Sequence, residues 1–405
     1  MSRPDILQRA WEQVRQNRGA AGIDGETIAA IEAYGVERML AELRARLEAK
    51  RYRPAAVRRV YIPKPGRPGE RRPLGIPAVR DRVVQAACKL VLEPLFEASF
   101  RPSSYGFRPK RSALQALEAI RTEVNAGANW VVDGDVADFF GSLDHDLLLR
   151  FVAERVSDRR VLRLLRLWLR AGVLEDGVIR STSTGVPQGG AISPLLANIY
   201  GHALDVLWEE EAGHLGKLIR YSDDFVVLCR TEAQAQAALV WLQATLDRLK
   251  LRLHPEKTRV VDLDQGAAGF DFLGFHIRRV ASWRYRGRSF CQRWPSRRAL
   301  MAIRARVRAV IGPRSQLSRD LAEVVGRLNP VIRGWGNYFR WGNSSRKFVQ
   351  IDSYVQERLA LFDSKKRGRS GRGWGTRHNA AWLQSLGVYR LSGTVQYGSP
   401  AKASV

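Results

Sequence analysis

Hydrophobic positions along the chain follow the period of a helix in some segments and form short runs typical of buried strands in others. This pattern predicts a protein that contains both helices and strands. Two short apolar runs within residues 218–228 enclose Asp223 and Asp224. Short apolar runs separated by turn residues are typical of two buried strands joined by a tight turn. Residues 130–132 are also apolar and lead to Asp135, so a second core strand is expected to end in a carboxylate.

Helical spacing of apolar residues accounts for most of the remaining N-terminal part. Met39, Leu43 and Leu47, for example, recur at intervals of three or four with charged residues between them. Helices are expected at residues 1–50 (with a Gly-rich break at 19–25), 80–95, 113–124, 147–174 and 232–250. Residues 60–77 predict a hairpin around a Pro/Gly turn, and residues 270–275 predict a strand that turns at Gly274.

A strongly basic segment follows at residues 276–347. It contains 17 Arg and one Lys against two acids, Asp320 and Glu323. Apolar residues at 300–310 and 321–328 recur at helical spacing, so helices with one buried face and one Arg-rich face are expected. The whole chain carries a formal charge of +27, which favours a polyanionic partner, and this segment is predicted to be its main nucleic-acid surface.

Membrane and secretory classes are not favoured. The sequence has no apolar run of about 18 residues and no basic-then-apolar leader, so neither a membrane span nor a signal peptide is expected. Cys88, Cys229 and Cys291 are isolated and form no Cys-x-x-Cys pair. This pattern suits a reducing, cytoplasmic location and argues against a Cys-rich nuclease module.

The three carboxylates predict metal-dependent phosphoryl chemistry. For Asp223 and Asp224 alone, an exposed Asp-Asp turn is the alternative, because Asp is a favoured turn residue. A second acidic strand end at Asp135 favours convergence of the three side chains. Such a cluster suits two Mg²⁺ ions, or Mn²⁺ in their place, as in two-metal nucleotidyl transfer.

Several motifs carry a family resemblance. Tyr221-Ser222-Asp223-Asp224 resembles the Tyr-X-Asp-Asp box of reverse transcriptases, and residues 184–200 and 328–339 are similar to motifs of the group II intron reverse transcriptase/maturase family, here without an endonuclease domain. The resemblance implies an α+β right-hand polymerase with an antiparallel palm sheet flanked by helices and an all-helical thumb/maturase domain. The implied divisions are an N-terminal extension (1–50), fingers and palm (51–277), thumb/maturase or X domain (278–362) and a basic C-terminal tail (363–405).

The resemblance also implies roles for single residues. Asp135, Asp223 and Asp224 would be catalytic and would bind metal, with the Val136 carbonyl as a further ligand. Phe140 would be the steric gate that excludes a 2′-hydroxyl, and a core aromatic is its alternative. The residues implied to bind the incoming dNTP are Lys64, Arg72, Phe140, Gln188 and Lys257.

Nucleic-acid contacts are implied in two further places. Around Tyr105 and Phe107, basic residues interleaved with rings suit a single strand, and a structural loop is equally compatible. In the maturase motif, the rings of Trp335, Tyr338 and Phe339 suit core packing better than base stacking. The residues expected to bind nucleic acid are Tyr105, Arg108, Arg111 and Arg333.

The predicted function is RNA-directed DNA polymerisation, a nucleotidyl transfer from dNTPs to a primer 3′-hydroxyl. The expected partners are group II intron RNA, an RNA template with a DNA primer, and target DNA, with no membrane. The expected location is the cytoplasm, on nucleoid or ribonucleoprotein. Two alternatives stay open: a cellular reverse transcriptase of intron ancestry without an intron partner, and an RNA-binding maturase with a splicing role only. The sequence gives no oligomeric state.

Overall fold

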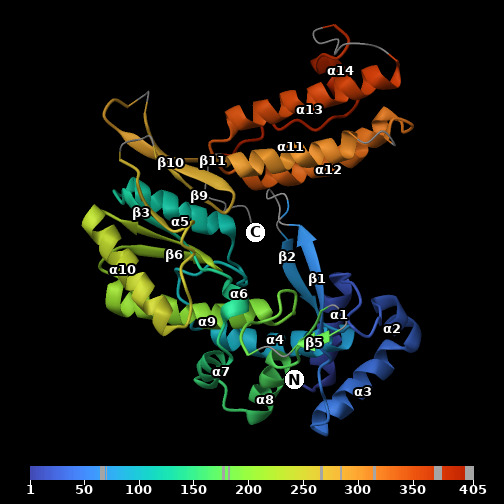
Figure 1. Cartoon of the computed structure of the whole chain (residues 1–405). Helices are drawn as coiled ribbons and strands as arrows, with labels where there is room; N and C mark the ends of the chain where they lie inside the picture. The colour runs from blue at the N-terminus through green and yellow to red at the C-terminus, as the bar shows by residue number, and fades with distance from the viewer. Residues whose placement is uncertain are drawn as a thin grey trace. The chain divides into compact units, whose positions relative to one another are not determined.

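The computed structural model of this chain describes residues 1–63, 69, 71–175, 178–180, 183–264, 268–282, 285–312, 316–368 and 376–396. The chain divides into two compact units, one of residues 1–116 and 130–260, the other of 117–129 and 261–405. Both contain helices and strands (Figure 1), which agrees with the predicted α+β class.

The first unit has a single hydrophobic core that includes the N-terminal helices. α1 packs along α4, and Leu7 and Trp11 of α1 are buried in this core together with Val83 of α4. The helices of this unit are α1 (Pro4–Gln16), α2 (Ile28–Tyr34), α3 (Val36–Glu48), α4 (Val79–Glu97), α6 (Phe139–Ser142), α7 (His145–Ala153), α8 (Arg159–Leu169), α9 (Ser193–Leu207), the π-helix η1 (Trp208–Ala212) and α10 (Glu232–Arg248). α5 (Ala113–Asn125) begins in this unit and continues into the second.

The long helix predicted for residues 147–174 is wrong in its continuity. α7 ends at Ala153, and α8 starts afresh behind Asp158, whose side chain accepts a hydrogen bond from the Arg160 N–H at 2.8 Å. An Asp at this position stabilises a new helix N-terminus, because it satisfies a free N–H group. The chain then enters a strand at Val173.

The central sheet of the first unit has the strand order β6-β7-β3-β8. Its strands are β3 (Trp130–Asp135), β6 (Lys217–Tyr221), β7 (Asp224–Cys229) and β8 (Arg259–Asp262). β7 pairs antiparallel with both β6 and β3, and its residues Phe225 to Cys229 are all buried. α10 packs on β3 and β7 (Figure 1), so the sheet is covered by a helix as the periodicity predicts.

A second sheet in this unit has the order β2-β1-β4-β5. Its strands are β1 (Val57–Pro63), β2 (Arg71–Ile76), β4 (Val173–Glu175) and β5 (Val178–Arg180). β1 and β2 form the expected antiparallel hairpin, with Tyr61 opposite Pro73. β1 also pairs in parallel with β4, where Val57 lies opposite Val173. The predicted dNTP contact Lys64 lies outside the described residues.

The second unit contains a sheet as well as helices, so the all-helical prediction for residues 278–362 is wrong at its start. The strands are β9 (Phe270–Phe272), β10 (Phe275–Ala281) and β11 (Ser289–Pro295), in the order β11-β10-β9. In β11 alternate residues are buried, including Arg293, whose guanidinium donates to Glu118 at 3.1 Å. The expected turn at Gly274 is observed, with a φ of +81°. The helices are α11 (Arg297–Ile311), α12 (Leu321–Phe339), α13 (Ser345–Lys366) and α14 (Ala380–Ser385).

An aromatic cluster forms part of the core of the second unit. The Trp335 ring lies 4.7 Å from that of Phe339 and 5.7 Å from that of Phe348, and Phe275 packs on Phe339 at 4.7 Å. The Tyr338 hydroxyl donates to the Leu273 carbonyl at 2.8 Å. Phe339 is buried, and Trp335 and Tyr338 are half-buried in the same cluster, which agrees with the core interpretation of these rings.

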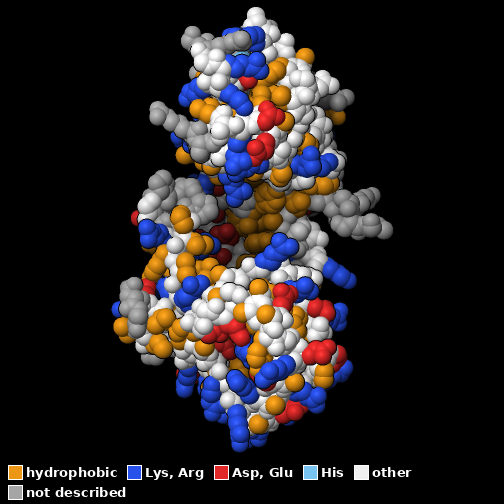
Figure 2. Space-filling view, turned by 90° about the vertical axis from the view of Figure 1, so that its right-hand side faces the viewer, with side chains coloured by type: hydrophobic (Ala, Val, Ile, Leu, Met, Phe, Trp, Pro, Cys, Tyr) orange, Lys and Arg blue, Asp and Glu red, His pale blue; other side chains and the backbone are white. Residues whose placement is uncertain are grey.

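The surface reflects the basic composition. Figure 2 shows Lys and Arg side chains spread over the face in view and more frequent there than acids, as the formal charge of +27 requires. Among the described residues, no helix combines the length and hydropathy needed to cross a bilayer.

Candidate active site

The carboxylates of two strands meet at one end of the central sheet. In the β3–β7 pair, Asp135 lies opposite Asp224, and the β6–β7 pair places Tyr221 opposite Asp224. Ser222 and Asp223 thus form a two-residue turn. Ser222 has a φ of +63°, the sign that the first central residue of a type II′ hairpin turn needs. The turn holds Asp223 and Asp224 beside Asp135.

The electrostatics of this cluster disfavour three bare negative charges. Partial removal from water, repulsion by Asp223 and a hydrogen bond with Asp135 raise the pKa of Asp224 to about 8, although its side chain keeps access to solvent. Removal from water, with a contribution from the charge of Asp135, also raises the pKa of Asp223. Raised carboxyl pKa values are typical of functional sites, and a bound cation would lower them again.

Lys257 supplies a positive charge to the cluster. The segment after α10 lies against the end of β3, since the His254 N–H donates to the Asp135 carbonyl at 2.7 Å and the Ala137 N–H donates to the Arg252 carbonyl at 2.8 Å. This places the Lys257 ammonium on the Asp135 carboxylate, to which it donates. The predicted dNTP contact Lys257 thus lies at the acidic cluster.

The donor set suits a hard divalent cation, because carboxylate oxygens are the ligands that Mg²⁺ prefers. In the part of the chain that the structure describes, no three His, Cys, Asp or Glu side chains are arranged as a ready-made metal site. The acids are adjacent, but one is engaged by Lys257. Val136 adjoins the cluster: its N–H donates to the Asp223 carbonyl at 3.4 Å.

A buried ion pair lies directly behind the turn. The Arg220 guanidinium donates to Asp205 of α9 at 2.7 and 2.5 Å, and both side chains are almost completely inaccessible, with 2% and 0% exposure. Arg220 also donates to the Ser104 hydroxyl at 2.9 Å and to the Ser222 carbonyl at 3.1 Å. The acidic turn is therefore tied through one guanidinium to α9 and to the loop that contains Ser104.

The same loop contains Arg108, and the prediction that this residue binds nucleic acid is wrong. Arg108 is buried, and its guanidinium donates to Glu97 at 2.7 Å and to the Arg101 and Ser104 carbonyls at 2.7 and 2.8 Å. These contacts occupy it within the protein, so it holds the loop together rather than facing a phosphate. Tyr105 and Arg111 remain partly accessible and contact each other, with the guanidinium carbon 5.4 Å from the ring centre.

Phe140 is linked to the loop that carries Gln188. The Phe140 carbonyl accepts from the Val186 N–H at 2.7 Å, and the Gln188 carbonyl accepts from the Gly75 N–H at 2.7 Å. Gln188 lines a hollow together with Gly75 of β2 and Gly141 of α6. The backbone of the predicted gate, Phe140, is thus bonded to the Gln188 loop, and that loop lines one hollow with the β1–β2 sheet and with Gly141, the neighbour of Phe140.

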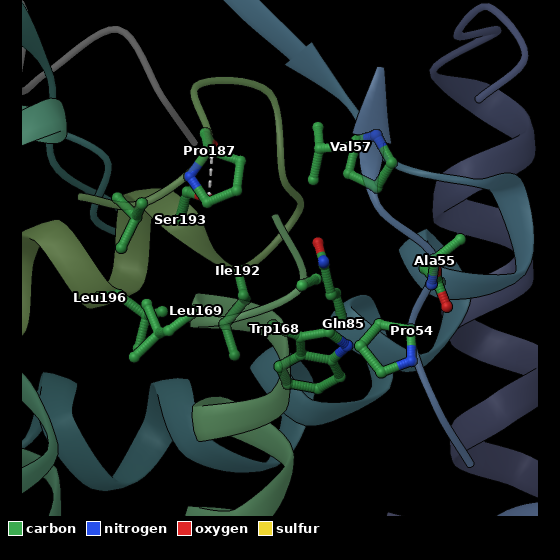
Figure 3. Close-up of a pocket in the computed structure, with 14 residues that line it drawn as sticks. Pro54, Ala55, Val57, Gln85, Trp168, Leu169, Pro187, Ile192, Ser193 and Leu196 are labelled. Carbon is green, nitrogen blue, oxygen red and sulfur yellow. Dashed lines mark hydrogen bonds between the residues drawn. The ribbon is translucent and has the colours of Figure 1, made fainter. Parts of the chain in front are cut away.

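Two side-chain hydrogen bonds hold the residues next to Gln188 in place. Figure 3 shows Pro187 and Ser193 facing each other above Gln85 and Trp168; the Ser193 hydroxyl donates to the Pro187 carbonyl at 2.8 Å. The Gln85 side chain accepts from the Ala191 N–H at 3.0 Å. These bonds satisfy polar groups that the loop would otherwise bury unpaired.

The other predicted contacts lie in two places. Arg72 is exposed on β2. Removal from water raises the pKa of Asp223, and the positive charge of Arg72 offsets a part of this rise. Arg72 is therefore close enough to the turn to act on it electrostatically. Arg333 lies in the second unit, exposed on α12 with its guanidinium 5.1 Å from the Tyr389 ring centre.

Sequence reasoning missed Arg220 and Asp205. Arg220 directly precedes the Tyr221 box, and a cation inside an apolar strand pattern signals a buried partner. Which acid is the partner depends on the packing of α9 and could not be read from spacing.

Comparison with known proteins adds two family matches. The family described as reverse transcriptase (RNA-dependent DNA polymerase) matches residues 62–277. The family described as group II intron, maturase-specific domain matches residues 300–382. The first match contains the acidic turn, and the second contains α12 with Arg333.

Three curated relatives extend this result. Protein YkfC of Escherichia coli (strain K12) is 35% identical over 321 residues, which cover 70% of this chain and 82% of that protein. Group II intron-encoded protein LtrA of Lactococcus lactis subsp. cremoris is 38% identical over 205 residues, 50% of this chain but 33% of LtrA. The uncharacterized 91 kDa protein in cob intron of Schizosaccharomyces pombe is 26% identical over 87% of this chain and 51% of its own length.

Proposed function

The chain belongs to the reverse transcriptase family and carries the maturase-specific domain of group II intron-encoded proteins, and on this premise we propose that it is an RNA-directed DNA polymerase. It would add dNTPs to the 3′-hydroxyl of a DNA primer on an RNA template. In this assignment the first unit supplies fingers and palm, and the second supplies the thumb/maturase domain.

The observation that carries the proposal is the register of the central sheet. Asp135 lies opposite Asp224, next to Asp223 in a two-residue turn. The surroundings raise the pKa of Asp223 and of Asp224, which is typical of a functional site rather than of a solvated turn. Asp135, Asp223 and Asp224, with the Val136 carbonyl, would hold two Mg²⁺ ions, which when bound activate the 3′-hydroxyl and stabilise the leaving pyrophosphate.

The remaining residues position the substrate. Arg72, together with Lys64, would bind the triphosphate and offset its charge. Lys257 would exchange its contact with Asp135 for the phosphates. Phe140 would lie under the sugar and exclude a 2′-hydroxyl, while Gln188 would contact the incoming nucleotide from the adjoining hollow.

A role with intron RNA is the second part of the proposal. The match to the maturase-specific domain and the excess of Arg in residues 276–347 support binding of group II intron RNA, assistance to its splicing, and access to target DNA. Arg333 would contact RNA, and Tyr105 and Arg111 the template. The protein would work on nucleoid or ribonucleoprotein. A cellular reverse transcriptase without an intron is the alternative, and the DNA that flanks the gene distinguishes them by the presence or absence of an intron RNA.

Primer extension tests the polymerase. Wild type, Asp223→Ala and the control Asp133→Ala are compared on poly(rA)/oligo(dT) with Mg²⁺ and dTTP. Asp133 lies on the same strand, but its carboxylate pairs with Arg259 at 3.3 Å. We expect wild type and the control to extend the primer and Asp223→Ala to lose at least about 100-fold in rate, the scale for loss of a group that stabilises transition-state charge. Equal incorporation by wild type and Asp223→Ala would refute the metal assignment.

A further inference from the structure

Phe107 has a backbone conformation that bulky residues avoid. Its φ is +53° and its side chain is 50% exposed, although it is a large apolar residue. Positive φ at a bulky non-glycine residue is a true outlier, and such strain persists only where surrounding contacts impose it. Neither burial nor turn preference explains why a Phe occupies this position.

Contacts on both sides of Phe107 impose the conformation. On one side, the Gly106 carbonyl accepts from the Asn198 side chain at 2.7 Å, and a Cβ on Gly106 would lie 2.6 Å from the Ser222 nitrogen. On the other side, the buried Arg108 is fixed to Glu97. The backbone of this loop is thus clamped against the catalytic turn, and Phe107 projects from it.

The ring of Phe107 meets the two aromatic residues that flank the acidic cluster. It stands edge-on to Phe140, with ring centres 6.5 Å apart and an interplanar angle of 83°, and it lies 6.4 Å from Tyr221. Phe140 is also edge-on to the buried Phe139, with ring centres 5.8 Å apart. Phe140 therefore contacts one ring from its own segment and one from the clamped loop.

We propose that Phe107 is a positioning residue for sugar discrimination, which fixes the ring of Phe140 so that it rejects a 2′-hydroxyl. This inference rests on the proposed polymerase function. A steric gate discriminates only if its ring cannot move aside, and Phe107 adds a second ring contact to the one that Phe139 makes with Phe140. The strained backbone at Phe107 is the cost of placing this second ring against Phe140.

The test separates support of the gate from direct contact with nucleic acid. Single-nucleotide incorporation by the full chain is measured as kcat/KM for dTTP and UTP, in wild type, Phe107→Ala, Phe107→Tyr and Phe140→Ala. We expect Phe107→Ala to lower the dTTP/UTP preference about three- to tenfold, the range that one aromatic edge contact supports. Most of the change should be a gain with UTP. Phe107→Tyr keeps the ring and should retain the wild-type preference.

A double variant supplies the second readout. If Phe107 acts only through Phe140, Phe107→Ala in the Phe140→Ala background should change the preference no further, because residues of one unit are not additive. Equal losses with dTTP and UTP in Phe107→Ala would instead show that the ring stacks on template or primer, and would overturn the inference. If Phe107→Ala does not fold, as judged by circular dichroism, Phe107→Leu serves in its place.

The polymerase activity and the role of Phe107 can be refuted separately. A wild type that extends no primer overturns the proposed function and this inference with it. A wild type that discriminates against UTP through Phe140, with a preference unaltered in Phe107→Ala, overturns the inference alone.

Discussion

Replacing Asp205 with Ala would leave the Arg220 guanidinium buried without its carboxylate. The two side chains are 2% and 0% exposed and share hydrogen bonds of 2.7 and 2.5 Å. Removing one partner of such a pair costs roughly 3–5 kcal/mol, because the remaining charge cannot return to water. We therefore expect Asp205→Ala to lower the free energy of unfolding of the first unit by that amount, and Asp205→Asn by less, since its amide oxygen still accepts.

The assay is unfolding in guanidinium chloride, followed by circular dichroism and tryptophan fluorescence. Glu48→Ala is the control, because Glu48 pairs with Arg44 on the surface with side-chain exposures of 50% and 48%, and such pairs contribute less than about 1 kcal/mol. The double variant Asp205→Leu/Arg220→Met should lose less than the two single variants together, because it removes both charges. A loss below about 1 kcal/mol in Asp205→Ala would refute the reasoning.

Two further predictions concern the loop at the active site and the C-terminal helices. Gly106→Ala should reduce primer extension and stability, since its Cβ would lie 2.6 Å from the Ser222 nitrogen, whereas Gly334→Ala, with nothing within 4 Å, should be neutral or stabilising in the same two assays. Removal from water raises the pKa of Asp363, but hydrogen bonds from His378 and Arg367 lower it by more. The contribution of these hydrogen bonds to the free energy of unfolding is therefore complete above the unfolded carboxyl pKa of about 4 and is lost as the pH falls below it. Asp363→Asn should abolish this acid-dependent part in melts between about pH 2 and 6, and an unchanged acid limb would contradict the assignment.

The sequence predicted the local elements around the site well. Apolar runs on both sides of Asp223 and Asp224 allow little except two strands and a turn, and β6 and β7 have that form. The second acidic strand end predicted that Asp135 would lie near the turn, and the structure achieves this by pairing β3 with β7. These features depend on neighbouring residues or on a period of two, which a sequence displays directly.

Two of the errors, at Arg108 and in residues 289–295, share a cause, which is the pairing of a cation with a buried acid elsewhere in the chain. Arg108 reads as a surface cation between Tyr105 and Arg111, yet Glu97, eleven positions earlier, draws it into the protein. Arg293 belongs to an alternating strand but is obscured by the Arg-rich composition, and its partner Glu118 is 175 positions away. A charge pattern shows how many cations exist, not which of them find a buried acid.

The strand order of the first unit also bears on biogenesis. β3 ends at Asp135, but its partner β7 begins only at Asp224. Likewise β1 begins at Val57, and its parallel partner β4 begins only at Val173. During translation both early strands emerge with an open edge, and such pairings across long sequence intervals form slowly. Unpaired edges invite association with other chains. We expect nascent chains to need chaperone protection until residues 224–229 leave the ribosome, and low expression temperature to raise the soluble yield.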